Sequence, residues 1–487
     1  MKLSSLASLK RPDLLSSPFA QGQDSNVSGP WFDVFNPADD SLVGRAPLMG
    51  EAQIDAAIDR ASAAFTAWSV KTATERSVVL KRWFNAIEAN AADLAAIMTA
   101  EQGKPFSEAL GEIAYAASFV EWFAEEAKRV YGDIVPTPQP GKRILVFKQP
   151  IGVCAAITPW NFPAAMITRK VAPALAAGCT MIVKPAEQTP LTAMALGRLA
   201  HEAGIPAGVL QIVTGKSRVI GHVLTASPLV RKLSFTGSTQ VGRMLMAQSA
   251  PTIKKLSLEL GGNAPFIVFE DADLDLAVEG AIAAKYRNAG QTCVCANRFY
   301  VQAGVYESFA ARFAERVKQM RAGDGAEQGV TIGPLIDDAA IDKVETLVAD
   351  AVAKGAKVLA GGRRHARGGR FYEPTVLGEA NSQMLVAQEE IFGPVAPLFR
   401  FQTEEEALKL ANDTEYGLAA YFYTEDARRV WRVSERLEFG IVGHNTGVIS
   451  NEVAPFGGWK QSGLGREGSR YGIEEYIEIK YLCSAIA

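Results

Sequence analysis

The chain has little cysteine and histidine, and neither is spaced for metal binding. Five cysteines and four histidines occur among 487 residues. The cysteines stand at positions 154, 179, 293, 295 and 483 and form no Cys-x-x-Cys pair, and no His-Glu-x-x-His sequence is present. Zinc sites and disulfide frameworks depend on such spacings. We therefore expect no metal site, and free thiols in a reducing, cytoplasmic compartment.

Long apolar runs and a bias of charge are also absent. No window approaches the roughly 18 uninterrupted apolar residues of a membrane-spanning helix. Residues 1–23 contain scattered Lys, Arg and Pro but no apolar run of signal-peptide length. Lys and Arg total 50 against 53 Asp and Glu. The balance favours a small-molecule substrate and gives no indication of a nucleic-acid or membrane partner.

The length and the order of apolar patterns indicate several domains. At about 150 residues per domain, 487 residues correspond to roughly three units. Residues 1–30 are irregular, and helical spacing follows over 51–68, 74–100 and 106–129. Prolines then punctuate 131–149, where 143–148 alternates as a strand that a second candidate, 473–481, could complete. Such a ribbon is marginal alone, so we expect it to pack against something larger, such as another subunit.

From residue 151 strands and helices alternate, which predicts parallel sheets covered on both faces. Strands are expected at 152–157, 180–183, 209–213 and 232–236. The helix after the first strand is expected to open at 160–163, with Pro163 in its first turn. The alternation continues to about residue 437. Two sheet domains with a boundary near Gly261 and Gly262 are the simplest division.

Several residues in this pattern carry candidate chemistry. Cys293 lies in a tight connection between a helix, which we expect to run to Asn288 and stop at Gly290, and a strand. A buried, inert thiol is the alternative for Cys293. Glu259 lies in a strand between two leucines, where desolvation would raise its pKa toward that of a general base. A buried ion pair is its alternative.

Two glycine-containing turns compete as a phosphate site. Residues 463–468 fit Gly-x-Gly-x-x-Gly, but no strand precedes them and the chain ends at 487, so we interpret them as a structural loop. The turn at 237–242 joins a strand to a helix and suits an anion better. Lys184 and Glu187, at the end of another strand, could hold ribose hydroxyls, or be solvated loop residues.

Seven motifs together carry a resemblance. In chain order they are Trp160-Asn161-Phe162-Pro163, Lys184-Pro185-Ala186-Glu187, Phe235-Thr236-Gly237-Ser238-Thr239, Glu259-Leu260-Gly261-Gly262, Gly290-Gln291-Thr292-Cys293, Glu390-Ile391-Phe392-Gly393-Pro394 and Pro455-Phe456-Gly457-Gly458. Their order and spacing resemble the aldehyde dehydrogenase superfamily over nearly the whole chain. Within this superfamily, the strongest resemblance is to the members that oxidise succinic semialdehyde in the degradation of γ-aminobutyrate (GABA). It is carried by residues 167–170, 285–295 and 449–452.

The resemblance implies an α/β fold with two Rossmann-type parallel-sheet domains and a small oligomerisation ribbon. It assigns 1–130 and 151–261 to a cofactor-binding domain and 262–445 to a catalytic domain. The ribbon would comprise 131–150 and 472–487, and the glycine-rich 446–471 would return to the active-site cleft. A homodimer or homotetramer is implied.

The resemblance also implies the chemistry. Cys293 would be the nucleophile, with its thiol pKa lowered locally; Asn161 and the Cys293 backbone N–H would hold the oxyanion, and Glu259 would activate water. The cofactor would be NAD or NADP, with NAD favoured because the Glu187 carboxylate would repel a 2′-phosphate. The residues implied to bind it are Trp160, Lys184, Glu187, Gly237, Ser238, Glu390 and Phe392.

For the substrate, the resemblance implies that Arg169, Arg287 and Ser450 bind the far carboxylate of a short semialdehyde. Without it, Arg287 would be a helix C-terminal cation and Arg169 a solvated helix residue. Cys295 is a candidate redox partner of Cys293, or a spectator thiol. His444 has no assigned role beyond an expected proximity to the cleft.

Three functional alternatives remain open on the sequence. The substrate could be glutarate semialdehyde or another short carboxylated aldehyde. The protein could be a catalytically silent binding or structural member of the fold, or a thiol hydrolase that uses no nucleotide. The intact pair of Cys293 and Glu259 disfavours a silent protein.

Overall fold

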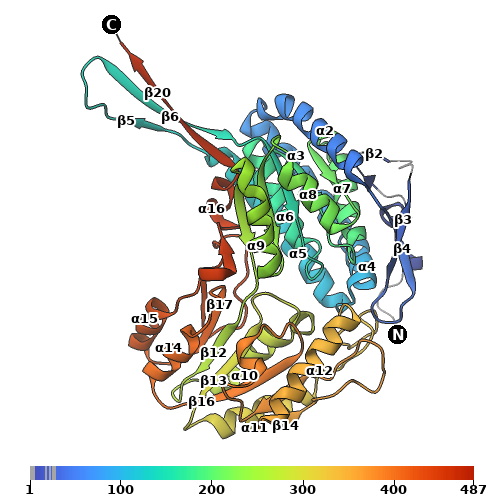
Figure 1. Cartoon of the computed structure of the whole chain (residues 1–487), viewed down its shortest axis with the longest axis vertical. Coiled ribbons are helices and arrows are strands. Elements are labelled where there is room, and N and C mark those ends of the chain that lie inside the picture. Colours follow the sequence, from blue (N-terminus) through green and yellow to red (C-terminus); the bar gives the residue numbers. More distant parts are fainter. Residues whose placement is uncertain (1–5, 17–18, 21–22, 25–28, 487) are drawn as a thin grey trace.

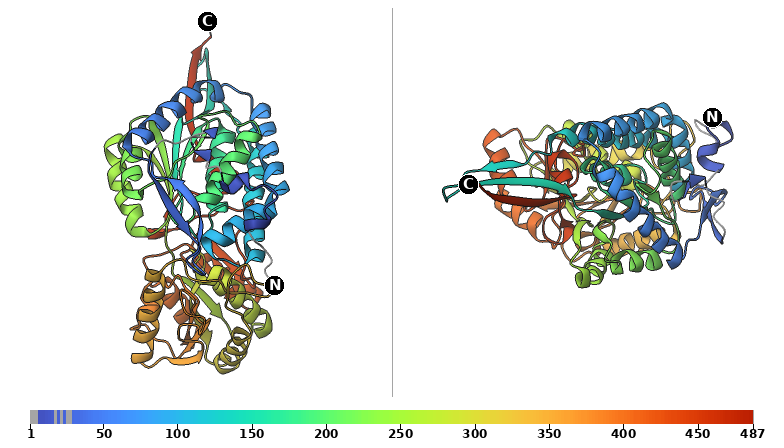
Figure 2. Two further views of the ribbon diagram at one scale, coloured as in Figure 1. Left: turned by 90° about the vertical axis from the view of Figure 1, so that its right-hand side faces the viewer. Right: turned by 90° about the horizontal axis from the view of Figure 1, so that it is seen from above.

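The computed structural model describes residues 6–16, 19–20, 23–24 and 29–486. Two α/β bodies stack on one another, and a thin ribbon projects from the first (Figures 1 and 2). Each body contains one large, mostly parallel sheet. The α/β fold with two Rossmann-like sheets is therefore confirmed.

The amino-terminal helices differ in one respect from the prediction. The helices are α2 (Glu51–Ser69), α3 (Ala73–Ala89), α4 (Ala91–Gln102) and α5 (Phe106–Glu126). The single helix expected over 74–100 is wrong, because Asn90 ends α3 and begins α4. Its side-chain amide donates to the carbonyl of Ala86 at 2.7 Å, a local bond that competes with helix continuation. The irregular lead-in, residues 1–30, lies partly outside the described residues. Its described part contains the short helix α1 (Asp13–Ser16) and two short paired strands, β1 (Phe19–Ala20) and β2 (Gln23–Asp24), and the strand β3 (Trp31–Phe35) follows it.

The first sheet has the strand order β19-β11-β10-β7-β8-β9. Its strands are β7 (Val153–Ile157), β8 (Thr180–Lys184), β9 (Leu210–Ile212), β10 (Val230–Thr236), β11 (Lys255–Glu259) and β19 (Gly463–Leu464). All pairings are parallel except that of β19, which runs antiparallel to β11. Every residue of β7 and β8 is buried, as expected for parallel strands with helices on both faces.

The helices of this body are α6 (Ala165–Ala177), α7 (Pro190–Glu202), α8 (Ser217–Ala226) and α9 (Thr239–Ser249). Helix α6 begins two residues after Pro163, so the prediction that Pro163 lies in its first turn is wrong. The Glu112 carboxylate accepts the N–H groups of Ala164 and Ala165 at 2.9 and 3.3 Å. This bond from another helix caps α6 at Ala165 and leaves 160–163 as a loop.

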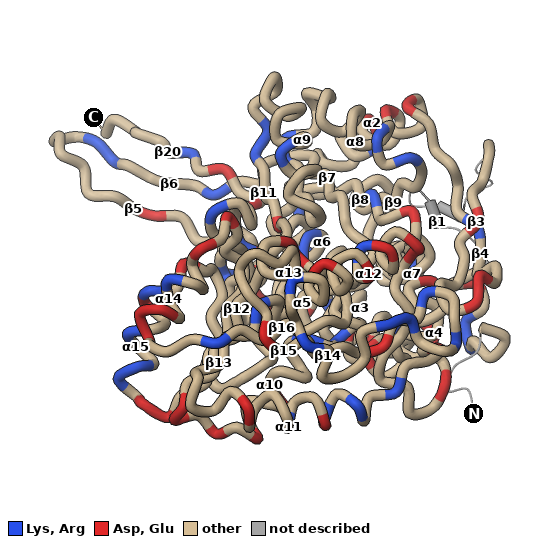
Figure 3. Tube along the Cα trace, turned by 60° about the horizontal axis from the view of Figure 1, so that its bottom comes forward, with Lys and Arg blue, Asp and Glu red and all other residues tan. Residues whose placement is uncertain are grey.

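The second sheet has the order β14-β15-β16-β13-β12-β17-β18. Its strands are β12 (Ala264–Val268), β13 (Ala296–Gln302), β14 (Lys357–Ala360), β15 (Thr375–Gly378), β16 (Val395–Phe401), β17 (Ala419–Tyr423) and β18 (Ile441–His444). Helices α10 (Leu274–Tyr286), α11 (Tyr306–Lys318), α12 (Asp338–Ala353), α14 (Glu404–Asn412) and α15 (Ala427–Arg436) cover it. Basic and acidic residues interleave along α11, α14 and α15 (Figure 3).

The ribbon is a three-stranded antiparallel sheet of β5 (Asp133–Val135), β6 (Lys142–Pro150) and β20 (Ile477–Ala485). Strand β20 pairs with β6 along its whole length, which confirms that the chain end completes the ribbon. The strand begins later than the predicted 473–481, because helix α16 (Ser469–Glu474) occupies the preceding residues. Within the described part of the chain, no helix combines the length and apolar character needed to cross a bilayer.

The carboxyl edge of the first sheet faces the amino edge of the second. Thr236, the last residue of β10, lies in register with Glu259, the last residue of β11, so both stand at the carboxyl edge of the first sheet. Cys293 lies just before β13, and Phe392 just before β16, so both stand at the amino edge of the second sheet. Side chains from these two edges therefore face a common space.

Candidate active site

A cavity of about 380 Å³ lies between these two edges. Trp160, Asn161, Gly237, Ser238 and Glu259 line it from the first body. Cys293, Glu390 and Phe392 line it from the second. The structure thus brings together all three residues predicted to act in catalysis and most of those predicted to bind a dinucleotide.

An unusual backbone turn presents Cys293. Helix α10 ends at Tyr286, not at Asn288 as predicted, and three successive residues then adopt left-handed conformations: Asn288 (φ 52°), Ala289 (φ 55°) and Gly290 (φ 76°). Such a conformation costs roughly 1–2 kcal/mol for a residue other than glycine. A Cβ at Gly290 would also lie only 2.2 Å from the carbonyl oxygen of Gly393. This turn ends α10 and directs the chain toward the cavity.

The Cys293 thiol is protonated in this environment. Burial raises its pKa to about 12, while the nearby Arg169 guanidinium opposes the shift. The lowered pKa that the mechanism requires is therefore not supplied by the residues around the sulfur alone. A thiolate at neutral pH therefore requires a further positive group or a proton acceptor near the sulfur.

Glu259 is buried and lines the cavity. Neither carboxyl oxygen has a hydrogen-bond partner among the described residues, so the alternative of a satisfied ion pair does not apply. Burial, reinforced by the Glu467 carboxylate, raises its pKa well above the usual value, and Arg169 and Lys170 oppose the shift. A desolvated carboxyl of this kind has the environment of a general acid or base.

The backbone of Asn161 is held by hydrogen bonds, and its side-chain amide keeps one hydrogen available. The Asn161 carbonyl accepts the Lys104 ammonium at 2.8 Å and the Asn288 amide at 3.0 Å. Its side-chain Nδ2 donates to the carbonyl of Gln291 at 3.0 Å. An amide nitrogen has two hydrogens, so one stays available for an anion beside Cys293.

The turn predicted to bind phosphate caps a helix at the cavity. Ser238 is the N-cap of α9, and its hydroxyl accepts the Val241 N–H at 3.4 Å. Gly237 precedes it, and both residues line the cavity. The amino terminus of α9 thus offers backbone N–H groups and a positive dipole end to an anion.

Two other predicted cofactor residues lie at the same edge of the sheet, two strands away from this turn, and not in the cavity lining. The Glu187 carboxylate accepts the N–H and the hydroxyl of Ser217 at 2.8 and 2.9 Å. The Lys184 ammonium also donates to the Ser217 hydroxyl, and burial lowers its pKa to about 8. Glu187 and Lys184 therefore meet at the start of α8, at the same carboxyl edge of the sheet.

Glu390 and Phe392 approach from the second body. The Phe392 ring meets Trp160 edge to face, with centroids 5.6 Å apart. The Glu390 carboxylate accepts the Gly262 N–H at 3.2 Å, and burial raises its pKa to about 7. A Cβ at Gly261 would lie 2.8 Å from a Glu390 oxygen, so a larger residue there would have to displace this carboxylate.

The residues predicted to bind the substrate carboxylate are not among those that line the cavity. Arg169 is buried, pairs with Glu467 and stacks on the Phe456 ring at 4.0 Å. One Arg169 nitrogen, Nη2, has no partner among the described residues. Arg287 is half-buried over the Phe162 ring at 4.9 Å, and Ser450 is half-buried in the segment after β18. The Arg169 and Arg287 charges both act on the pKa of Cys293, so they lie near the thiol.

Cys295 does not line the cavity. Its Sγ donates to the carbonyl of Lys285 at 3.3 Å, and the residue is buried. All five cysteines lie in the described part of the chain and are free. Pairing with Cys293 stays a prediction. Among the described residues no cluster of three potential metal ligands occurs.

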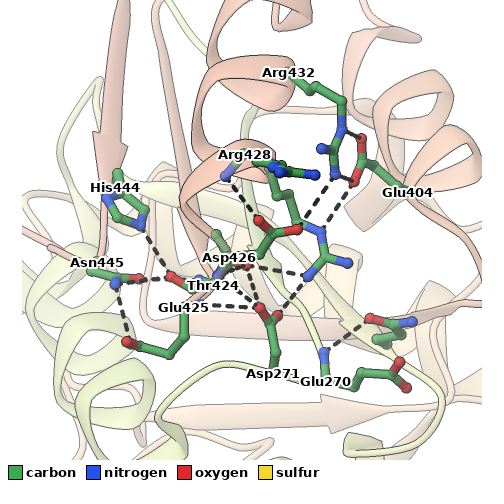
Figure 4. A network of polar contacts seen from close by, with 12 residues as sticks. Glu270, Asp271, Glu404, Thr424, Glu425, Asp426, Arg428, Arg432, His444 and Asn445 are labelled. Atoms are coloured by element: carbon green, nitrogen blue, oxygen red, sulfur yellow. Dashed lines mark hydrogen bonds and ion pairs between the residues drawn. The ribbon is translucent and has the colours of Figure 1, made fainter.

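His444 lies at the opposite end of the second sheet from Cys293, so its expected proximity to the cleft is wrong. It ends β18, at the carboxyl edge, and its Nε2 lies 3.1 Å from the carbonyl of Thr424 (Figure 4). Asp271 organises the same turn by accepting the Thr424 hydroxyl at 2.7 Å. Cys293 precedes β13 at the amino edge, about 20 Å away along a seven-residue strand. His444 is therefore part of a surface turn.

Buried residues that the sequence did not single out support the site. They are Gln102, Lys104, Glu112, Asn288 and Gln291, and all are buried. The Gln102 amide donates to the Asn288 side chain at 2.9 Å, and the Asn288 N–H donates to Glu108 at 2.8 Å. Four of them belong to runs of polar residues at the end of α4 and in the loop before β13, and Glu112 lies inside α5 with no signal in the sequence.

Fold and site together define a class of protein: a two-body α/β enzyme with a cysteine and a carboxyl group facing one cavity beside a helix terminus suited to phosphate. The aldehyde dehydrogenase family model matches residues 24–482. The chain belongs to the aldehyde dehydrogenase family.

Relatives similar over most of their length have different names. The chain is 61% identical over 469 residues to succinate-semialdehyde dehydrogenase [NADP(+)] of Escherichia coli, covering 95% of this chain and 97% of the relative. It is 61% identical to glutarate-semialdehyde dehydrogenase of Pseudomonas aeruginosa, with the same coverage. It is 62% identical over 477 residues to 3-sulfolactaldehyde dehydrogenase of Pseudomonas putida, covering 98% of each.

Solved structures share the whole fold. An aldehyde dehydrogenase from Brucella melitensis superposes with a TM-score of 0.97 at 64% identity, over 99% of each chain. A betaine aldehyde dehydrogenase of Staphylococcus aureus, solved with NAD+, superposes with a TM-score of 0.94 at 34% identity, over 97% of this chain and 98% of that one.

Proposed function

We propose that this protein oxidises a short aldehyde with a remote acid group to the corresponding acid, with succinic semialdehyde as the first candidate substrate. The observation that carries the proposal is the cavity shared by Cys293, Asn161 and Glu259. The family supports the reaction class. A role in the degradation of GABA and a reducing cytoplasmic compartment belong to the same proposal.

The reaction begins at Cys293. The thiol first loses its proton to water or to the Glu259 carboxylate in the same cavity, and the thiolate then adds to the aldehyde carbon and forms a thiohemiacetal. The available hydrogen of the Asn161 amide and the Cys293 N–H stabilise the oxyanion. Loss of hydride from the same carbon then leaves a thioester on Cys293.

Glu259 acts in the second half of the reaction. Its unpartnered carboxylate takes a proton from a water molecule, which attacks the thioester carbon and releases the acid and the free thiol. Because its pKa is raised, Glu259 must lose a proton before it can act, and Arg169 and Lys170 favour that charged form.

A dinucleotide fits the residues present. Ser238 and the first turn of α9 suit its pyrophosphate, Lys184 and Glu187 suit a ribose, and Glu390 with Phe392 lies near Cys293 on the nicotinamide side. When bound, the oxidised dinucleotide supplies the hydride acceptor and a positive ring charge. We propose NAD as the preferred form because the Glu187 carboxylate would repel a 2′-phosphate, although two of the relatives are named for NADP.

Arg169, Arg287 and Ser450 bind the remote acid group of the substrate. A guanidinium holds an anion with charge-assisted bonds, and Arg169 Nη2 is buried with no partner among the described residues. The three relatives are named for aldehydes that each carry a carboxylate or sulfonate away from the aldehyde carbon. Glutarate semialdehyde and 3-sulfolactaldehyde are therefore the alternative substrates.

The ribbon forms an interface with another copy of the chain. Its exposed apolar side chains include Tyr131, Ile134, Phe147, Ile479 and Tyr481. Projecting apolar strands of this kind favour burial against a partner. We propose a homodimer or homotetramer, which sedimentation of the purified protein distinguishes from a monomer.

One kinetic panel tests the proposal. Reduction of NAD and of NADP is followed with succinic semialdehyde, glutarate semialdehyde, 3-sulfolactaldehyde and butanal. We expect the highest kcat/KM with one of the three acidic aldehydes. An equal kcat/KM for butanal would refute the proposal that Arg169, Arg287 and Ser450 bind the acid group. Cleavage of an ester without dinucleotide binding would instead favour a thiol hydrolase. A Cys293→Ala variant as active as wild type would refute the mechanism.

A further inference from the structure

Lys104 lies behind the catalytic cavity in a buried arrangement that the mechanism above leaves unused. It follows the carboxyl terminus of α4 and is 2% exposed. Its ammonium donates to the carbonyl of Asn161 at 2.8 Å, forms an ion pair with Glu112 and lies 4.0 Å from the Phe162 ring centre. Every one of these contacts reaches the 160–165 segment or the residue that caps it.

Glu112 links Lys104 to the start of α6. One of its oxygens pairs with Lys104, and the other accepts the N–H groups of Ala164 and Ala165. A buried ion pair whose oxygens are all used is rigid, because moving either partner leaves an uncompensated charge. Lys104 thus binds the Asn161 carbonyl, and Glu112 binds the backbone at the end of the same loop.

The same carbonyl joins the two sides of the site. The Asn161 oxygen accepts both Lys104 and the Asn288 amide, which itself comes from the left-handed turn before Cys293. The Asn161 side chain then donates to Gln291, two residues before Cys293. The position of the Asn161 amide relative to the sulfur is therefore set by the two bonds to the Asn161 carbonyl together with this side-chain bond.

We propose that Lys104, with Glu112, is a positioning residue that aims the Asn161 amide at the oxyanion formed on Cys293. The inference rests on the proposed function. Removal of one donor from an oxyanion site typically lowers kcat about 10²- to 10³-fold, and a displaced donor loses part of that effect.

The test is a double-mutant cycle. Lys104→Met alone leaves Glu112 unpaired and endangers folding, so the neutral pair Lys104→Met with Glu112→Gln is used, in which the Gln oxygen can still cap α6. We expect kcat to fall about 10- to 100-fold with little change in the KM for the aldehyde. In an Asn161→Ala background the same change should alter kcat by no more than about twofold, since the donor it aims is gone.

A matched control separates positioning from stability. Lys232 is another buried lysine, which donates to Ser257 at 2.5 Å and pairs with Glu475. Lys232→Met should lower the Tm without kinetic coupling to Asn161. Equal fold losses from the neutral pair in both backgrounds, or an unchanged kcat, would overturn the inference. A wild-type enzyme without aldehyde oxidation would instead overturn the proposed function.

Discussion

Replacing Arg287 by Met tests the recognition of the acid group with little damage to the fold. Arg287 is half-buried over the Phe162 ring, and its contact with that ring is the interaction the structure defines for it. Arg169 is a poorer choice, because its removal would take a partner from the buried Glu467. The change at Arg287 removes a cation but leaves an apolar stem of similar length.

The expected magnitude follows from one charge-assisted contact. Such a bond contributes about 1.5 to 3 kcal/mol, which corresponds to about 10- to 150-fold in kcat/KM. We expect that loss for succinic semialdehyde and almost none for butanal, which has the same chain length and no charge. The assay is initial-rate formation of the reduced dinucleotide with both aldehydes.

Arg312→Met is the matched control. Arg312 is an exposed arginine of α11 that pairs with Asp275 on α10, the same helix that precedes Arg287. Its loss should change kcat/KM for succinic semialdehyde and for butanal by no more than about twofold each. Equal losses for the charged and the uncharged aldehyde in Arg287→Met would refute recognition of the acid group by this residue.

Three further predictions concern ionisation. Because burial raises the pKa of Cys293 to about 12, its alkylation by iodoacetamide in the free enzyme should accelerate about tenfold per pH unit between pH 7 and 10; a plateau from pH 7 would contradict this. Glu187→Gln removes the charge that opposes a 2′-phosphate, so the ratio of kcat/KM with NADP to that with NAD should rise; an unchanged ratio would argue against a role of Glu187 in the choice. Burial also raises the pKa of Glu101, which caps α7 at Leu191 and Thr192, to about 7. Since the folded pKa exceeds the unfolded one, the stability that protonated Glu101 contributes is present below about pH 4.5 and lost as the pH rises through 7. The Tm of Glu101→Gln relative to wild type should therefore rise between pH 5 and 8, and a constant difference would exclude this titration.

The sequence predicted those features that local patterns encode. The alternation of strands and helices predicted both parallel sheets, and the turn at Gly237 and Ser238 predicted the helix terminus at the cavity. The alternating chain end predicted its pairing with residues 143–148. The environment of Glu259 was predictable as well, since a carboxyl between two leucines of a parallel strand must be buried.

Features that depend on distant contacts could not be predicted. Arg169 and Glu467 are 298 residues apart in the chain, and Lys104 and Asn161 are 57 apart. No periodicity in the sequence signals either pair. The raised pKa of Cys293 likewise follows from burial between two bodies, which the surrounding residues do not reveal.

Three local errors had identifiable causes. The break at Asn90 arises from a side-chain bond that the helical spacing conceals. The later start of α6 arises from capping by Glu112, a residue of another helix. The position of His444 follows from the direction of β18, whose carboxyl end lies away from the cavity.

The most direct test of the account is the mass of the Cys293 peptide after reaction. In Glu259→Gln the water-activating carboxylate is absent, so the thioester should accumulate. Rapid acid quenching after mixing with succinic semialdehyde and NAD, followed by mass spectrometry, should show a succinyl adduct on Cys293 and about one equivalent of NADH per active site. NADH formation without an adduct on Cys293 would contradict the covalent mechanism.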